Sequence, residues 1–415
     1  MSLDLLNMYK GAEELDLENQ VTETAEDVAE EVARAEVAEA TVEIQEQGEQ
    51  VAQLVETVQD LEEQVEELEE TVEGLEGLLR SGNFNAGAFA NMYNRAAKLS
   101  ANLGGRATAR MGAESFSDAA TAQVMARDGM EGFMDKVKGW GKTAIEFIKN
   151  IFNAVISFFV GIFNKVEGLQ RRHDALVKRV DAAEKVKDKI KLGGWNVWID
   201  YEKNGASESK ANKLGDAVTK LVAYCDVAKK VESANIGAFN SAYTALVNAL
   251  KSGTSGGKEV KEGSKKKVMQ EIGGIRVLFT YEAESVDKAE DAPKAAKALK
   301  LMVGKAPEAK KLTTGEVAAK ADKSALKTAL GEVAGSISGL RQGKADRAFS
   351  AAERDRVIAS LNTVKAANDE EAKERKGQVA IVRAVYSSGA SILKTLAQAE
   401  TSAADALLSC VAAHV

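Results

Sequence analysis

The stretch VAQLVETVQDLEEQVEELEETVEGLEGLL, residues 51–79, has the most regular pattern in the chain. Its apolar residues recur at alternating spacings of three and four, which is the heptad pattern of a coiled-coil helix. Valine takes the first core position of each heptad and leucine the second, at Val51, Leu54, Val58, Leu61, Val65, Leu68, Val72 and Leu75. The register extends back through Gln47, Ile44, Ala40 and Val37. We therefore expect one helix from about residue 21 to residue 79, built as a parallel two-stranded coil.

Acidic residues fill nearly all positions beside this apolar core. In a homodimer, Glu62, Glu69 and Glu76 would find no basic residue at the facing positions. Repulsion along these edges weakens a homodimer, and a partner chain with basic edges would suit the helix better. A homodimer and a heterodimer are both open, and a solitary solvated helix is the third alternative.

Charge divides the chain into two regions. Residues 1–114 contain 26 Asp and Glu against 7 Lys and Arg, a net charge of −19. Residues 115–415 hold the remaining 37 acidic and 48 basic residues, a net of +11, so that the whole chain has a net charge of −8. Such an asymmetry indicates an acidic interaction or masking segment joined to a body that tolerates polyanions.

Composition predicts a mostly helical protein without a catalytic centre. The chain has only 2 prolines, which are the strongest helix breakers. Cys225 and Cys410 form no metal or redox motif, so we expect free buried thiols in a reducing compartment. The 2 histidines and the acidic residues form no recognisable catalytic or metal-binding pattern, which favours a non-enzyme without a cofactor. We expect no secretory signal and no membrane span, since no stretch reaches the ~20 apolar residues that a span requires.

A junction rich in Gly, Asn and Ala follows the heptads. Residues 81–113 carry four basic residues and no acidic one, and they predict a flexible linker with at most one short helix near 88–101. The expected fold class is mostly α: a long N-terminal coiled coil, a flexible linker, and an elongated helical bundle with at most a small β hairpin. The segments are an acidic coiled coil at 1–80, the linker at 81–114, an apolar-aromatic helical segment at 115–192 and a basic helical body at 193–415.

The helix predicted at 145–166 is unusually apolar. Fifteen residues between Lys149 and Lys165 carry no charge, a length of roughly 22 Å against the ~30 Å hydrocarbon core of a membrane. The helix is therefore either a core helix or an interfacial membrane helix with basic ends. The residues that would carry either role are Phe147, Ile151, Phe152, Phe158, Phe159 and Phe163.

The basic body shows weaker patterns. Residues 195–199 alternate in polarity and predict a short strand, whose best partner is the β-rich IRVLFTYE at 275–282. The rest predicts one or two helices over 208–251, a loop at 252–266, a helical segment at 286–345 and a helical hairpin over 349–411 that turns near Gly377 or Gly389.

Lysines gather in the region of the predicted loop. Because no aromatic residues are interleaved with them, they suit phosphate neutralisation better than base recognition. Weak, salt-sensitive and non-specific contact with DNA is one interpretation, and an ordinary solvated face is the other. The candidates are Lys258, Lys265, Lys266 and Lys267.

An acidic helical N-terminus, a junction of small residues and a basic helical body together resemble the internal head proteins of giant tailed bacteriophages. In that family a prohead protease removes a propeptide after the pattern small residue, any residue, Glu. Gly112, Ala113 and Glu114 match this pattern, and the run SFSDAATAQVMARDGMEGF from Ser115 is similar to mature N-termini of such proteins. The tripeptide also occurs at 11–13, 182–184, 206–208 and 351–353.

The resemblance implies a structural virion protein that is assembled in the host cytoplasm and packaged inside the head. Its implied partners are the prohead core or scaffold proteins, the prohead protease and, weakly, DNA, with ejection into the host and contact with a host membrane as further implications. The alternatives are a membrane-active, pore-forming helical protein held soluble by its acidic N-terminus and a cytosolic coiled-coil adaptor.

Overall fold

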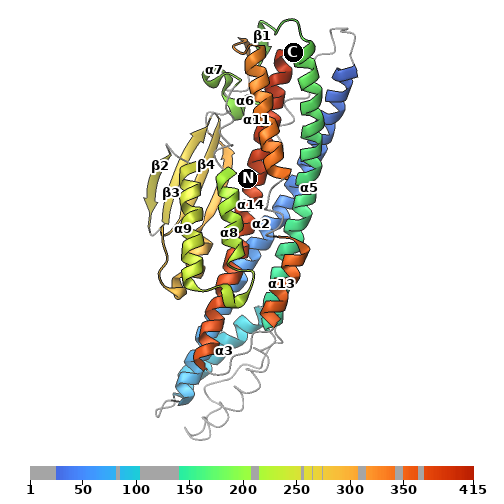
Figure 1. Cartoon of the computed structure of the whole chain (residues 1–415). Helices are drawn as coiled ribbons and strands as arrows, with labels where there is room; N and C mark the ends of the chain where they lie inside the picture. Colours follow the sequence, from blue (N-terminus) through green and yellow to red (C-terminus); the bar gives the residue numbers. More distant parts are fainter. Residues whose placement is uncertain are drawn as a thin grey trace. The chain divides into compact units, whose positions relative to one another are not determined.

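The computed structural model describes residues 25–80, 85–102, 140–206, 215–253, 257–263, 265–272, 274–306, 315–341, 349–362 and 369–415. These residues form two compact units, of which one joins the N-terminal part up to Gln53 to Ile151–Val415 and the other is Leu54–Asn150. Helices dominate the described residues, and the strands form only small antiparallel sheets (Figure 1). The prediction of a mostly α protein with minor β structure is confirmed.

The heptad stretch lies in one long helix. Helix α2, Ala25–Arg80, has 56 residues, as the unbroken apolar periodicity predicted. In the smaller unit, α3 (Ala86–Asn102) confirms the short helix expected in the junction and runs back along α2. The guanidinium of Arg95 contacts Glu67 at 2.5 Å, and Met92 lies over Gly74.

The predicted coiled-coil core residues have different surroundings. Val51, Leu68, Val72 and Leu75 are buried within this single chain, whereas Leu54 is partly exposed. The side chains of Val58, Leu61 and Val65 lie outside the described set. A two-stranded coil with a second chain stays a prediction.

Two long helices form the centre of the larger unit. Helix α5, Trp140–Ala182, enters this unit at Ile151, and α14, Asp369–His414, has 46 residues. Helix α11 (Lys323–Arg341) packs against α14, and α13 (Ala351–Asn362) contacts α5 where Arg354 donates to Asn153 at 2.8 Å.

The expected turn at Gly377 or Gly389 is wrong, because α14 runs through both glycines. Gly389 has a packing role instead. Cys225 belongs to α8, Gly215–Asp226. A Cβ atom at Gly389 would lie 2.8 Å from the Sγ atom of Cys225, so the absence of a side chain at Gly389 lets α14 and α8 approach closely. Cys225 and Cys410 are both free and buried, as expected.

The apolar face of α5 lies in the protein core. Ile151, Phe152, Phe158 and Phe159 are buried and Phe163 is half-buried, while the side chain of Phe147 lies outside the described set. The ring of Phe152 packs 4.8 Å from that of Tyr386, centroid to centroid. Among the described helices, only Ile148–Ala182 is long and apolar enough to cross a membrane, and 56% of its most apolar window is buried.

A four-stranded antiparallel sheet packs beside these helices, with the strand order β2-β3-β4-β5. Helices α9 and α10 contact β4, and α14 contacts β5. Figure 1 shows α9 beside the strands of the sheet. The strands are β2 Lys258–Glu262, β3 Lys265–Ile272, β4 Ile275–Tyr281 and β5 Lys300–Lys305. The helices are α8 Gly215–Asp226, α9 Ile236–Gly253 and α10 Ala292–Ala298, with short 3-10 turns at Val231–Ser233 and Ala289–Asp291.

The β structure differs from the predicted hairpin. The strand at 275–282 is confirmed as β4, but it pairs with β3 and β5. Residues 195–199 are helical instead, because α6 (Asn196–Ile199) and α7 (Tyr201–Asn204) form consecutive single turns. Asp200 between them has φ 51°, and Asn196 accepts the backbone N–H of Tyr201 at 2.7 Å. Alternating polarity over five residues fits one helical turn as well as a strand, so the strand predicted from this alternation was wrong.

Two predicted segments contain more strand than expected. The loop at 252–266 includes β2 and the start of β3, and the helical segment at 286–345 includes β5 and β6 (Glu316–Ala318). Strand β6 forms a two-stranded ribbon with β1, Lys189–Lys191. These strands are short or rich in charged residues, and each has only one or two of the β-branched residues on which strand prediction depends.

The end of α14 is held by a buried hydrogen-bond chain. The Nδ1 atom of His414 lies 2.7 Å from the carbonyl oxygen of Cys410, and its Nε2 atom lies 2.7 Å from the hydroxyl of Tyr201. That hydroxyl already accepts the backbone N–H of Lys320 at 2.6 Å. The neutral ring with its proton on Nδ1 therefore satisfies every group. Burial accordingly lowers the pKa of His414.

Candidate nucleic-acid interface on the sheet

The two faces of the four-stranded sheet differ in burial. On β4, Val277, Phe279 and Tyr281 are buried, and they alternate with partly exposed residues. The register pairs Lys266 with Tyr281, so Lys266 belongs to the covered face. Residues one position away point to the opposite face, here called the open face.

The open face combines basic and apolar side chains. Thr280 of β4 pairs with Lys267 on one side and with Lys300 on the other, which places both lysines on this face. The apolar Val260 and Met302 share this face, with 45% and 46% of their surface exposed. The basic residues that the register assigns to the open face are Lys258, Lys265, Lys267, Arg276 and Lys300.

Three of the four predicted DNA-contacting lysines therefore share one face. Lys258, Lys265 and Lys267, here called the open-face lysines, come from the edge hairpin of β2 and β3. Lys258 and Lys265 are exposed, and Lys267 is partly exposed. The predicted set of four did not include Arg276 and Lys300, which the strand register connects to this face. The same register also assigns two acidic positions to the open face, Glu262 opposite Lys265 and Glu271 opposite Arg276, and their side chains lie outside the described set.

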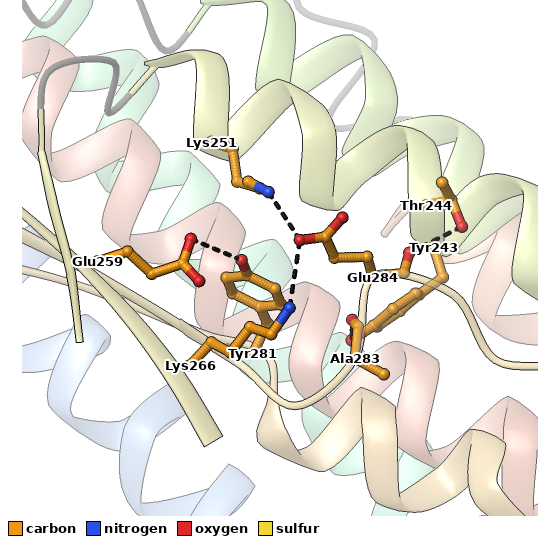
Figure 2. Close-up of polar contacts among 8 residues, drawn as sticks. All are labelled: Tyr243, Thr244, Lys251, Glu259, Lys266, Tyr281, Ala283 and Glu284. Carbon is orange, nitrogen blue, oxygen red and sulfur yellow. Dashed lines mark hydrogen bonds and ion pairs between the residues drawn. The ribbon is translucent and has the colours of Figure 1, made fainter. Parts of the chain in front are cut away.

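Lys266 has a different, structural role on the covered face. Figure 2 shows its ammonium and that of Lys251 converging on Glu284, at 3.3 Å and 2.9 Å from the same carboxylate oxygen. Both ammonium groups also lie 5.6 Å from the centroid of the Tyr281 ring. The hydrogen bond from Lys251 lowers the pKa of Glu284 and in turn raises the pKa of Lys251. Lys266 therefore joins β3 to α9 and to the segment after β4.

Neighbouring hydrogen bonds attach the same segment to α9 and β2. Tyr243 donates to the carbonyl oxygen of Ala283 at 2.9 Å, and Thr244 donates to that of Glu284 at 3.0 Å (Figure 2). The hydroxyl of Tyr281 donates to Glu259 of β2 at 3.4 Å. Burial is the largest cause of the raised pKa of Tyr281. These contacts hold the edge hairpin in register and so fix the spacing of the open-face lysines.

The chemistry of the open face suits a polyanion. Side chains two residues apart on a strand are separated by about 7 Å, and neighbouring strands by ~4.8 Å, so the cations form a two-dimensional array. Ammonium groups neutralise phosphates without reading bases. Among the described residues, no group of three or more His, Cys, Asp and Glu could hold a metal ion.

The candidate cleavage residues Gly112, Ala113, Glu114 and Ser115 lie outside the described residues. Two of the alternative matches are described fully. Residues 182–184 lie at and just after the end of α5, where Ala182 and Glu184 are exposed, so this match is accessible to a protease. Residues 351–353 form the first turn of α13, where Glu353 is buried and bound by Arg356 at 2.6 Å. A protease acts on exposed, extendable backbone, so this alternative is a poor substrate.

Comparison with known protein families supplies the decisive observation. The family model of phiKZ-like phage internal head proteins matches residues 12–415. The chain belongs to this family. The match spans the acidic helix α2 as well as the basic body, so both charge regions belong to one family architecture. No curated protein and no solved structure matches the chain.

Family membership confirms the resemblance inferred from the layout of the sequence. This internal head protein is a structural component of the virion, located inside the phage head among other head components.

Proposed function

We propose that this internal head protein joins the prohead core through its acidic N-terminal region and is then cut by the prohead protease after Glu114. Its basic body stays in the mature head beside the packaged DNA. The family match over residues 12–415 supports the proposal, because it identifies the chain as a phage internal head protein. The host cytoplasm would be the place of assembly.

Charge supplies the physical reason for a cut at this place. Before DNA enters, the −19 region screens the +11 body and can bind basic edges of other core proteins. Once the acidic region has been cut off and released, the remaining residues 115–415 carry a net charge of +11. The open-face lysines would then meet DNA phosphates with weak, salt-sensitive affinity and without sequence preference.

Ejection into the host is a further part of the proposal, and a role at the host membrane is the second candidate function. The apolar length of Ile148–Ala182 favours that second function. Phe152 and Phe158 are buried in the larger unit, however, so α5 would first have to separate from its neighbours. Leakage of lipid vesicles by the protein, lost on Phe158→Asp while folding is retained, would support membrane activity. Intact vesicles at all protein concentrations would exclude it.

The first test is the intact mass and N-terminal sequence of the protein from purified virions. A start at Ser115 would support the proposed cut. A chain that begins near Met1 in mature, DNA-filled heads would refute it. The same analysis on proheads without an active protease gives the matched uncut control.

A further inference from the structure

The N-terminal part of α2 packs against α5 and α14, and the surface of these two helices that it covers is here called the α5–α14 groove. Gly168 of α5 faces Val37 and Ala33, and a Cβ atom on that glycine would lie 2.8 Å from a Val37 methyl carbon and 3.4 Å from its backbone nitrogen. Gly161, seven residues earlier, faces Ile44 in the same way. The apolar residues of α2 that are buried in this part are Ala33, Val37, Ala40, Ile44 and Val51.

The same helix contributes to a buried ion-pair cluster. Arg172 of α5 has only 2% of its side chain exposed. Its Nε atom donates to Glu30 of α2 at 2.6 Å, and its Nη1 atom donates to Asp405 of α14 at 2.6 Å. One guanidinium thus joins three helices, with a planar fork that suits two carboxylates. Glu30 is itself buried, so α2 places a charge inside the larger unit.

Further polar contacts extend along the groove. Arg171 pairs with Glu36 at 2.6 Å at the exposed rim, and Arg179 lies 3.9 Å from Glu30. On the α14 side, Lys394 donates to the carbonyl oxygen of Gly48 at 3.1 Å. Acidic groups of α2 therefore meet basic groups of α5 at defined positions, which fixes the register of the helix in the groove.

We propose that residues 25–53 act as a helical ligand for the α5–α14 groove, and that they stay bound after the chain is cut. This inference rests on the proposed cut near Glu114. Cleavage alone would then give a two-chain complex in which the acidic fragment still screens the basic body. Release of the fragment would be a second, separate step, and it would withdraw Glu30 from Arg172 and uncover the strip at Gly161 and Gly168.

The test uses the full-length protein with the recognition sequence of a site-specific protease in place of residues 107–111. After complete digestion, the fragments are separated by size-exclusion chromatography at micromolar concentration, in 0.1 M and 1 M salt. We expect both fragments to elute together at the position of the uncut protein. Separation of the wild-type fragments immediately after digestion would refute the proposal.

A matched pair of variants identifies the contact that holds the fragment. Glu30→Gln removes the buried negative charge beside Arg172, whereas Glu31→Gln removes the same charge one residue away on the exposed side of α2. Arg172 keeps its ion pair with Asp405 in E30Q, so the variant loses the strength of one charge-assisted hydrogen bond, and its fragment should bind roughly 10-fold more weakly. We expect E31Q to bind like the wild type. Circular dichroism of each uncut variant shows whether it folds.

Gly168→Leu is an independent variant on the opposite side of the contact. Its new side chain would collide with the backbone of α2, so the digested variant should release the fragment. If E30Q and Gly168→Leu release the fragment no more readily than E31Q, the fragment is held elsewhere and the inference is wrong. Because the cut is engineered, this result does not depend on where the phage protease acts, which N-terminal sequencing tests separately.

Discussion

Replacing Lys165 by methionine should stabilise the folded protein. Lys165 lies on α5 with 1% of its surface exposed, and burial lowers its pKa from 10.5 to about 8 against a smaller raising effect of Asp405. The difference of 2.5 pKa units corresponds to about 3 kcal/mol that disfavours the charged form at neutral pH. Methionine keeps most of the length and packing without the charge.

The net gain should be smaller than this pKa difference. Methionine also loses the contacts of the ammonium group, including its attraction to Asp405. Asp405 keeps its ion pair with Arg172 at 2.6 Å, so its charge stays paired. We therefore expect Lys165→Met to raise the free energy of unfolding by about 1–3 kcal/mol at pH 7, as seen when buried charges give way to apolar residues of similar volume.

Denaturant titration of the full chain, followed by circular dichroism, measures this change. The pH dependence identifies its cause. The folded pKa of Lys165 is lowered, so between about pH 8 and 10.5 the unfolded chain binds more protons and the wild type gains stability as pH rises. The advantage of the variant should therefore shrink towards pH 10.5.

Lys178→Met is the control, because Lys178 is an exposed lysine on the same helix and its replacement should change stability by less than about 0.5 kcal/mol. A variant at Lys165 that is less stable than the wild type by more than about 1 kcal/mol would refute the reasoning. A stability gain of Lys165→Met that stays constant between about pH 8 and 10.5 would also refute it.

Three further outcomes are expected. Arg172→Ala should destabilise the protein by roughly 3–5 kcal/mol in denaturant titrations, because it leaves two buried carboxylates behind, whereas Arg171→Ala at the exposed rim should cost less than about 1 kcal/mol. Replacing all three open-face lysines by glutamine should reduce the slope of log K against log[salt] for DNA binding, measured by fluorescence anisotropy, by up to about 2.7. Lys266→Gln should have little effect on this slope. An unchanged slope in the triple variant would exclude this surface as a DNA-binding site. Burial lowers the pKa of His414 below 6.5, so its contribution to stability should be complete above pH 6.5 and decline as pH falls through the lower pKa of the folded state. The melting temperature of His414→Asn should therefore change less between about pH 7.5 and 5 than that of the wild type.

The long helices were predictable because their signals are long. The heptads before Leu79 and the apolar run of α5 each repeat over several turns, and a repeated period distinguishes a helix from a strand. The family resemblance was also accessible from sequence, through the charge division and the junction near Glu114. The expected buried thiols follow from cysteine chemistry alone.

The errors came from short or polar segments. Residues 195–199 are too few to separate one helical turn from a strand, and Gly389 reads as a turn signal although it marks close packing against Cys225. Lys266 and the open-face lysines have separate roles because successive side chains of a strand point to opposite faces. The lysine-rich composition gave no sign that this segment forms a strand. The groove for α2 could not be inferred, because Glu30 and Arg172 lie far apart in the sequence.

The packing of α2 against α14 has a consequence for the timing of synthesis. Lys394 reaches Gly48 across 346 residues of chain. At about 5–20 residues per second, a ribosome needs roughly 20–70 s to traverse that interval. The larger unit can complete its fold only after this delay. During the same interval the newborn acidic helix is already outside the ribosome, where an assembling head could engage it before its own groove exists.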